Sequence, residues 1–263
     1  MLDGMLGDLS VFHLILLPLI GAVGGVIAGM VGSGGGVLVV PMLVYFGGVR
    51  WEAATGISAA QYFFGAMSGV VPHWRRRNVY LRVGVAMMVT GVVFAQLGAL
   101  LSALMPEWTL SLLYLLLAVV AATSLLFPTR EERAGTDDSE MPRPNWLLIG
   151  GMGMLVGLVD GILGVGGGFM LVPLMVFVLQ MRTRPAIGTS LFVIAGTMAS
   201  ALTGKLLQEQ VPLLYSALVT LGAVAGAQLG ARFSGRLRPS VLRRMLSVMI
   251  YLVCIRILWD VFT

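Results

Sequence analysis

Residues 32–41 read Gly-Ser-Gly-Gly-Gly-Val-Leu-Val-Val-Pro, and residues 164–173 read Gly-Val-Gly-Gly-Gly-Phe-Met-Leu-Val-Pro. The second stretch begins 132 residues after the first in a chain of 263, which indicates an internal duplication into two halves. Each glycine costs a helix roughly 1 kcal/mol, so three in succession predict a break in the helix. Broken helices at matched points of two membrane-embedded halves are typical of transporter binding sites.

The composition is that of a polytopic membrane protein. Hydrophobic residues make up 58% of the chain and charged residues 11%, and the mean hydropathy is +0.94. A soluble domain carries roughly twice that share of charged residues. Apolar runs close to the spanning length of about 20 residues occupy 11–31, 53–71, 79–104 and 109–127, and similar runs follow in the second half.

One polar interval, residues 128–145, separates the halves. Its content of Pro, Gly and charged residues predicts a flexible linker. We therefore expect a first membrane repeat at 1–127, a linker at 128–145 and a second membrane repeat at 146–263. Each repeat is predicted to be all-α, with a broken glycine-rich helical hairpin followed by three transmembrane helices.

The number of crossings decides how the repeats are oriented. Residues 11–31 are long enough to span the bilayer, whereas residues 37–46 reach about half of its thickness as a helix. A hairpin that enters and leaves on one side, plus three spans, gives each half an odd number of crossings and predicts inverted repeats. That arrangement places 14 of the 17 Lys and Arg residues on one side. The positive-inside tendency then predicts a cytoplasmic linker, with both termini outside.

The five tryptophans lie at the predicted segment ends, where an indole prefers the headgroup region. They are Trp51, Trp74, Trp108, Trp146 and Trp259. We also expect four basic residues near span ends to be interfacial, namely Arg50, His73, Arg182 and Lys205.

The glycines before each break predict close packing with a neighbouring helix. They recur at spacings of three and four residues, at Gly21, Gly25, Gly29 and Gly32 and again at Gly153, Gly157, Gly161 and Gly164. Such spacings place them on one face of a helix, against which another backbone packs closely.

The glycine triplets themselves predict an anion site. The first amides of the short helix after each break have no carbonyl partner within that helix, and they lie at the positive end of its dipole. Two such ends approaching from opposite faces suit a small anion, unless neighbouring side chains satisfy the amides instead. The candidate residues are Ser33, Gly34, Gly35, Gly36, Gly166, Gly167 and Gly168.

Polar residues within the spans are further candidates. Ser58, Thr189 and Ser190 follow the hairpins at matched positions, and Gln61 lies one turn from Ser58. Gln96 and Gln228 form a matched pair, which serves either as ligands or as hydrogen bonds between helices.

Asp160 is a carboxylate well inside a span, and the equivalent residue of the first repeat is Ala28. An intramembrane acid suggests a protonation site that couples transport. The alternative is a fixed hydrogen bond to neighbouring backbone.

The sequence excludes several other functions. Its single cysteine, Cys254, rules out an internal disulfide and a cysteine-based metal site. The two histidines, His13 and His73, lie far apart, and no HExxH, CxxC or GxSxG motif occurs. We therefore expect no metal, no cofactor and no enzymatic activity. The net charge of +5 is accounted for by arginines between spans, so we expect no nucleic-acid partner.

The doubled GxGGGxxxxP phrase, each time followed by a Gly-x-Ser at 56–58 and 188–190, resembles the sulfite exporter TauE/SafE family of bacterial membrane permeases. The family motif falls on the two glycine triplets and on Pro41 and Pro173, and Val165 stands where the first copy has Ser33. The resemblance implies transport of a small sulfur-containing or organic anion, such as sulfite or a sulfonate, across the bacterial cytoplasmic (inner) membrane.

The leading hypothesis is a secondary transporter that exposes its anion alternately to the two sides. A passive anion channel and a membrane partner protein without transport activity are the alternatives. The lipid bilayer and the anion are the expected partners. Coupling to a proton or to sodium and assembly into a homo-oligomer are left open.

Overall fold

The structure, a computed structural model, describes residues 11–31, 35–126, 145–234 and 239–262. The first half contains α1 (Val11–Val31), the single 3₁₀ turn η2 (Gly35–Leu38), α2 (Val39–Tyr45), α3 (Trp51–Arg75), α4 (Leu81–Leu104) and α5 (Glu107–Leu126). The second half contains α7 (Trp146–Leu163), α8 (Gly168–Phe177), α9 (Thr183–Leu207), α10 (Leu213–Ser234) and α11 (Pro239–Phe262). All regular structure in these residues is helical, as predicted. The predicted linker falls almost entirely outside them.

The two halves contain the same helices in the same order. Helices α9, α10 and α11 begin 132 residues after α3, α4 and α5, respectively. The predicted break is confirmed in the second half, where α7 ends at Leu163 and α8 begins at Gly168. In the first half α1 is followed by η2 and α2, and residues 32–34 between them lie outside the described residues.

The bundle carries apolar helices of membrane-spanning length. Among the described residues, three helices are long and apolar enough to cross a bilayer: Leu81–Leu104, Trp146–Leu163 and Pro185–Leu207. On α4 the exposed side chains Val85, Val89, Val93 and Leu97 recur every four residues and form one apolar stripe. A stripe of this kind, on the outside of an apolar bundle, is suited to lipid rather than to water.

Helices from opposite halves pack backbone to backbone at the predicted glycines. A side chain at Gly21 would overlap the carbonyl oxygen of Val219 in α10, and a side chain at the equivalent Gly153 would overlap that of Met87 in α4. Gly25 and Gly157 make the same kind of contact, with Ala223 and Gly91. The predicted glycine stripe is therefore confirmed for these positions, and α1 packs on α10 as α7 packs on α4.

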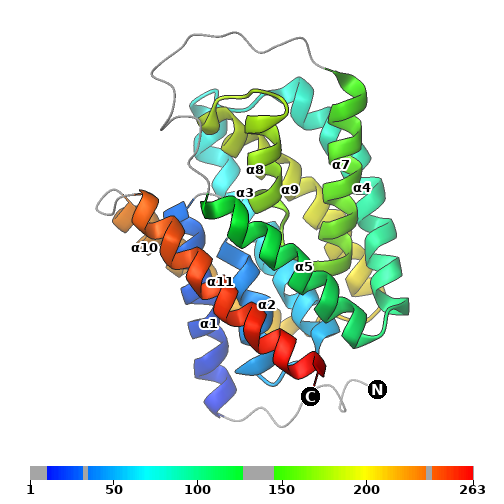
Figure 1. The fold of residues 1–263 in the computed structure, drawn as a ribbon, viewed down its shortest axis with the longest axis vertical. Coiled ribbons are helices and arrows are strands. Elements are labelled where there is room, and N and C mark those ends of the chain that lie inside the picture. The colour runs from blue at the N-terminus through cyan, green and yellow to red at the C-terminus, as the bar shows by residue number, and fades with distance from the viewer. Residues whose placement is uncertain (1–10, 32–34, 127–144, 235–238, 263) are drawn as a thin grey trace.

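The middle of the bundle is formed by α3 and α9, which occupy equivalent positions in the two halves (Figure 1). Thr55 near the start of α3 contacts Lys205 near the end of α9. His73 near the end of α3 lies against Gly188 near the start of α9. The two helices are therefore antiparallel.

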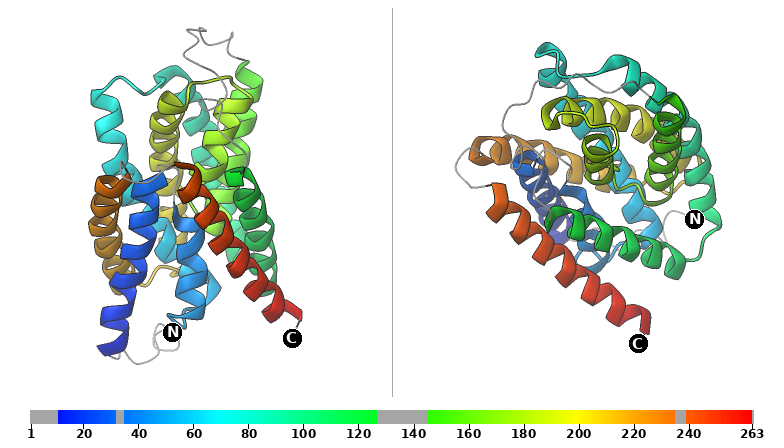
Figure 2. Two further views of the ribbon diagram at one scale, coloured as in Figure 1. Left: turned by 60° about the vertical axis from the view of Figure 1, so that its left-hand side comes forward. Right: turned by 45° about the horizontal axis from the view of Figure 1, so that its top comes forward.

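Helices α5 and α11 lie side by side across one side of the bundle (Figure 2), where the Ser247 hydroxyl donates to the Ala122 carbonyl at 2.9 Å.

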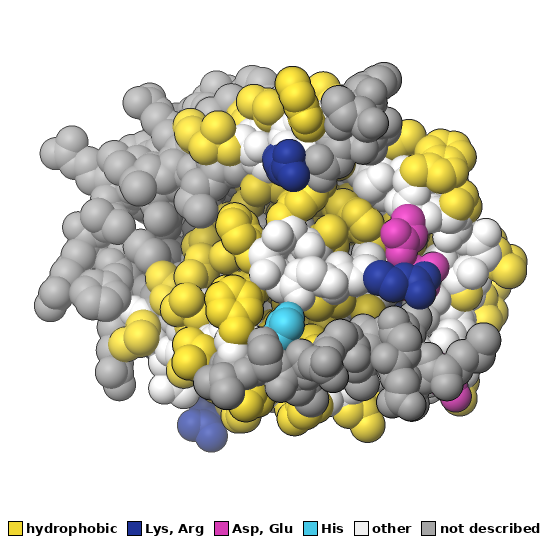
Figure 3. All heavy atoms as spheres, turned by 90° about the horizontal axis from the view of Figure 1, so that it is seen from below, with side chains coloured by type: hydrophobic (Ala, Val, Ile, Leu, Met, Phe, Trp, Pro, Cys, Tyr) yellow, Lys and Arg dark blue, Asp and Glu magenta, His cyan; other side chains and the backbone are white. Residues whose placement is uncertain are grey.

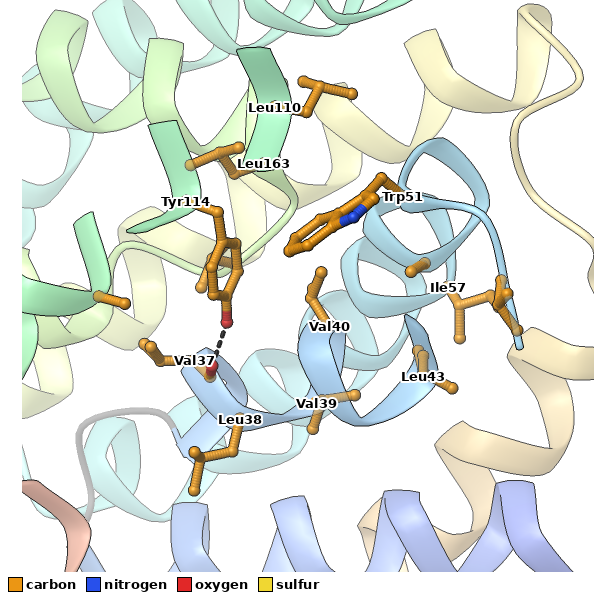
Figure 4. Close-up of a cluster of buried hydrophobic side chains, with 14 of the residues drawn as sticks. Val37, Leu38, Val39, Val40, Leu43, Trp51, Ile57, Leu110, Tyr114 and Leu163 are labelled. Carbon is orange, nitrogen blue, oxygen red and sulfur yellow. Dashed lines mark hydrogen bonds between the residues drawn. The ribbon is translucent and has the colours of Figure 1, made fainter. Parts of the chain in front are cut away.

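All five tryptophans lie at or near helix ends, as predicted, but Trp51 differs from the other four in its exposure. Trp74, Trp108, Trp146 and Trp259 are exposed at helix ends, with exposed fractions of 49–64%. Trp51 also begins a helix, but only 8% of it is exposed. Its ring centroid lies 5.6 Å from that of Tyr114, in the apolar cluster that surrounds η2 and α2 (Figure 4).

Replacement of Gly157 by alanine should destabilise the bundle. The added methyl group meets backbone atoms of Gly91, which cannot rotate away, so α7 must move off α4. Overpacking of this kind costs about 1–3 kcal/mol. The matched control is Gly151→Ala in the same helix, where an added methyl group meets no atom within 4 Å. Thermal unfolding in detergent should show a lower midpoint for Gly157→Ala alone, and equal midpoints would contradict the packing.

Candidate functional site

The chain turns at the second break because two glycines adopt left-handed conformations. Gly164, with φ of 60°, ends α7, and Gly166, with φ of 62°, precedes α8. Both conformations favour glycine. Both positions also lie directly on α3, because a side chain at Gly164 would overlap the Thr55 carbonyl oxygen and one at Gly166 would overlap the Tyr62 ring. The second glycine triplet is therefore buried between its own hairpin and the central helix of the other half.

Asp160 provides hydrogen-bond acceptors at the start of α8. Its Oδ1 accepts a hydrogen bond from the backbone N–H of Gly167, and its Oδ2 accepts one from the Thr197 hydroxyl at 2.7 Å. The carboxyl group is fully buried. A carboxylate at this position complements the positive end of the α8 dipole. The Gly167 amide, a predicted ligand of the substrate anion, thus donates to an acid of the protein itself.

A different contact holds the first break. The Tyr114 hydroxyl of α5 donates to the carbonyl oxygen of Val37 in η2 (Figure 4). Neither side-chain contact is repeated at the equivalent position of the other half. Leu246 occupies the position equivalent to Tyr114, and Ala28 occupies the position equivalent to Asp160.

The predicted ligands of the first break are only partly described. Gly35 and Gly36 lie in η2, whereas Ser33 and Gly34 fall outside the described residues.

Two predicted ligands on α3 are buried polar groups that lack partners. Ser58 is fully buried and Gln61 is 7% exposed. Ser58 Oγ and Gln61 Oε1 have no hydrogen-bond partner among the residues that the structure describes. The Gln61 amide lies beside Gly24 of α1, which also contacts Val39 of α2. Buried polar groups are nearly always hydrogen-bonded, so these two atoms are exceptions within the described part of the chain.

The predicted hydroxyl groups on α9 already have partners. Thr189 Oγ1 accepts from the Tyr80 backbone N–H at 2.9 Å, and the Ser190 hydroxyl donates to the Ile187 carbonyl at 2.9 Å. Ser58 and Ser190 are equivalent in sequence, but only Ser58 lacks a partner among the described residues.

The two matched glutamines lie in unlike environments. The Ser200 hydroxyl of α9 donates to the Val92 carbonyl of α4 at 2.7 Å, and the Gln96 side-chain oxygen lies 3.4 Å from the same hydroxyl, a contact between helices. Gln228 is exposed on the surface of α10. Neither residue is brought to Ser58 or to Asp160 by a described hydrogen bond.

The expectation that Lys205 is interfacial is wrong, because its side chain is fully buried. Its Nζ lies within hydrogen-bond distance of four oxygen atoms, belonging to Thr55, Ser102, Ile162 and Gln210. One signal was available in the sequence: Lys205 is the single lysine beside sixteen arginines. A lysine in a chain whose other long basic side chains are all arginines indicates a position that favours a compact ammonium group over a guanidinium group.

Removal of the Asp160 acceptor should destabilise the second break. Asp160→Ala leaves the Gly167 amide without a partner, which costs about 1–3 kcal/mol. Asp160→Asn retains an oxygen for that amide. Because both variants are uncharged, the difference between them isolates the hydrogen bond. Thermal unfolding without added anion should rank the asparagine variant above the alanine variant, and equal stability would contradict the cap.

Comparison with known proteins places the chain among transporters. The sequence model of the family described as sulfite exporter TauE/SafE matches residues 17–257. A probable membrane transporter protein of Xylella fastidiosa is 28% identical over 243 residues, which cover 91% of this chain and 92% of the relative. The probable membrane transporter protein YunE of Bacillus subtilis is 21% identical and covers 94% of this chain and 97% of its own length. No solved structure matches the chain significantly.

Proposed function

The chain belongs to the sulfite exporter TauE/SafE family, and from that premise we propose that it is a secondary transporter of a small sulfur-containing or organic anion. Membership makes it a multi-pass membrane transporter rather than an enzyme. Sulfite or a sulfonate is the proposed substrate class. The proposed location is the bacterial cytoplasmic membrane, and the proposed mechanism is alternating access.

The two halves form inverted repeats in this proposal. The support is that equivalent helices run in opposite directions: α3 is antiparallel to α9, and α1 and α7 begin at opposite ends of the bundle (Figure 1). The contacts are also exchanged symmetrically, since a side chain at Gly56 would overlap the Gln210 carbonyl and one at the equivalent Gly188 would overlap the Asn78 carbonyl. Repeats of this kind allow one assembly to rock against the other around a central site.

The end at which α1 begins faces outward in this proposal. Hydrophobic side chains cover much of that end, and its basic side chains are scattered (Figure 3). At the opposite end, α3 ends at Arg75, and Arg76 and Arg77 follow it directly; all three arginines are exposed. A cluster of arginines is typical of the cytoplasmic side.

The anion binds beside the first break, against α3. The observation that carries this proposal is that Ser58 Oγ and Gln61 Oε1, both buried, have no hydrogen-bond partner among the described residues. A hydroxyl group and a side-chain amide are both able to donate hydrogen bonds to an oxyanion. Rotation of the Gln61 amide would present its NH₂ group where Oε1 now lies.

The two breaks play unequal roles. At the second break the Asp160 carboxylate already occupies the start of α8. Asp160 is therefore the candidate for coupling, because protonation of its carboxyl group would weaken its hold on that amide. The equivalent Ala28 offers no carboxylate to the first break, which leaves the first break to the substrate.

Reconstituted protein tests the proposal directly. Proteoliposomes should take up sulfite, a sulfonate or a small carboxylate saturably, with a rate that depends on an imposed proton or sodium gradient. A high, uncoupled electrical conductance would instead indicate an anion channel. Absence of flux for all three anions under both gradients would contradict transport and favour a partner protein.

Ser58→Ala and Gln61→Leu should weaken anion binding without loss of stability. Hydrogen bonds to charged groups contribute about 1.5–3 kcal/mol, and each 1.4 kcal/mol is about tenfold in affinity. We expect the affinity measured from thermal stabilisation by sulfite to fall at least tenfold. The unfolding midpoint without anion should be unchanged or raised, because a polar atom without a partner is removed from the interior.

Ser247→Ala is the control, since this buried hydroxyl already donates to the Ala122 carbonyl. It should lower stability and leave anion affinity unchanged. Wild-type affinity in both α3 variants would contradict the proposed site.

A further inference from the structure

Lys205 is a buried amine whose Nζ is surrounded by neutral oxygens. Its Nζ lies 3.0 Å from Thr55 Oγ1, 3.2 Å from Ser102 Oγ, 3.3 Å from the Ile162 carbonyl oxygen and 3.5 Å from Gln210 Oε1. These atoms come from α3, α4, α7 and the segment between α9 and α10, so four parts of the chain converge on one ammonium group.

The hydroxyl groups around Nζ are oriented to accept. The Thr55 hydroxyl donates its proton to the Glu52 carbonyl at 2.7 Å, and the Ser102 hydroxyl donates to the Ala99 carbonyl at 2.7 Å. Their lone pairs are therefore left for Nζ. An ammonium group has three donors and no acceptor, so this arrangement suits the protonated lysine.

No described carboxylate forms an ion pair with Lys205. Glu52 lies one turn before Thr55 on α3, but its carboxylate pairs with Arg50 at 3.2 Å. Both carboxylate oxygens of Asp160 are engaged by Gly167 and Thr197. A buried cation without an adjacent anion is costly, and within a membrane protein such a charge usually marks the path of a substrate or an ion.

Lys205 lies beside the second break and on the same central helix contact as Ser58 of the proposed site. Its partner Thr55 touches Gly164 of the second break, and its partner Ile162 lies in the last turn of α7. Ser58 follows Thr55 by one turn of α3, on a similar face. Lys205 also joins α9 to α3, the equivalent helices of the two repeats, so motion of one repeat against the other would change its contacts.

We propose that Lys205 supplies the positive charge that pairs with the transported anion, which is a small oxyanion carrying at least one full negative charge. This inference rests on the proposed transport function. The anion approaches Nζ in place of the Gln210 amide oxygen, the longest of the four contacts. Ser58 and Gln61 then donate hydrogen bonds that orient the anion, while Lys205 attracts it by charge.

The test compares Lys205→Met and Lys205→Arg with the wild-type protein in detergent and in proteoliposomes at pH 7. Sulfite and methanesulfonate are the probes. Methionine fills a similar volume without a charge, and replacement of buried ions by apolar groups is often neutral or stabilising. Arg256→Met, which removes an exposed cation from α11, is the matched control.

We expect Lys205→Met to lose at least tenfold in affinity for sulfite, with a smaller loss for the singly charged methanesulfonate, because the lost attraction scales with ligand charge. Lys205→Arg should retain part of the affinity, and Arg256→Met should behave as wild type. A purely structural role would affect both anions equally.

The outcomes separate the two proposals. If the wild-type protein binds and transports neither anion, the proposed function fails. If the wild-type protein binds sulfite and a folded Lys205→Met variant binds it equally well, only the role of Lys205 is overturned. Should the methionine variant not fold, the ratio of sulfite affinity to methanesulfonate affinity in Lys205→Arg decides. A ratio below that of the wild type supports the inference, because the bulkier guanidinium group spreads its charge. An unchanged ratio overturns it.

Discussion

A helix that breaks inside a membrane protein must find partners for its freed backbone groups within the protein, because lipid offers none. In this chain the requirement is met at the second break by Asp160, which accepts the Gly167 amide, and at the first by Tyr114, which donates to the Val37 carbonyl. The Asp160 contact provides an acceptor for a backbone N–H group, and the Tyr114 contact provides a donor for a backbone carbonyl group. The two breaks are alike in sequence and different in the chemistry that holds them.

This difference makes the two repeats chemically unequal. Here the second break carries its own carboxylate, while Ser58 Oγ and Gln61 Oε1 have no partner among the residues that the structure describes. The single lysine is buried among neutral oxygens where the equivalent helices of the two halves meet. Asp160 and Lys205 are thus both buried close to the end of α7, and each has other described hydrogen-bond partners.

The glycines make this arrangement possible by removing side chains from the contacts between halves. Helix α1 approaches α10 at Gly21 and Gly25, and α7 approaches α4 at Gly153 and Gly157. Without a hydrophobic force between helices in lipid, close backbone packing is a principal source of association. The tight outer contacts hold α3 and α9 together in the middle, where the buried polar residues lie.

The sequence by itself determined the repeat, the all-helical membrane class, the two breaks and the packing glycines. These features depend on local conformational preference and on hydropathy, both of which can be evaluated from neighbouring residues. Only the tertiary structure decided that Trp51 is buried, that Gln96 contacts Ser200 while Gln228 is exposed, and that Lys205 is internal. These environments are set by residues distant in the chain: Lys205 and Thr55 are 150 positions apart, and Asp160 and Thr197 are 37 apart. A sequence pattern places a side chain on a helix, but its partners are known only once the helices are packed, because contact depends on distance in space and not along the chain.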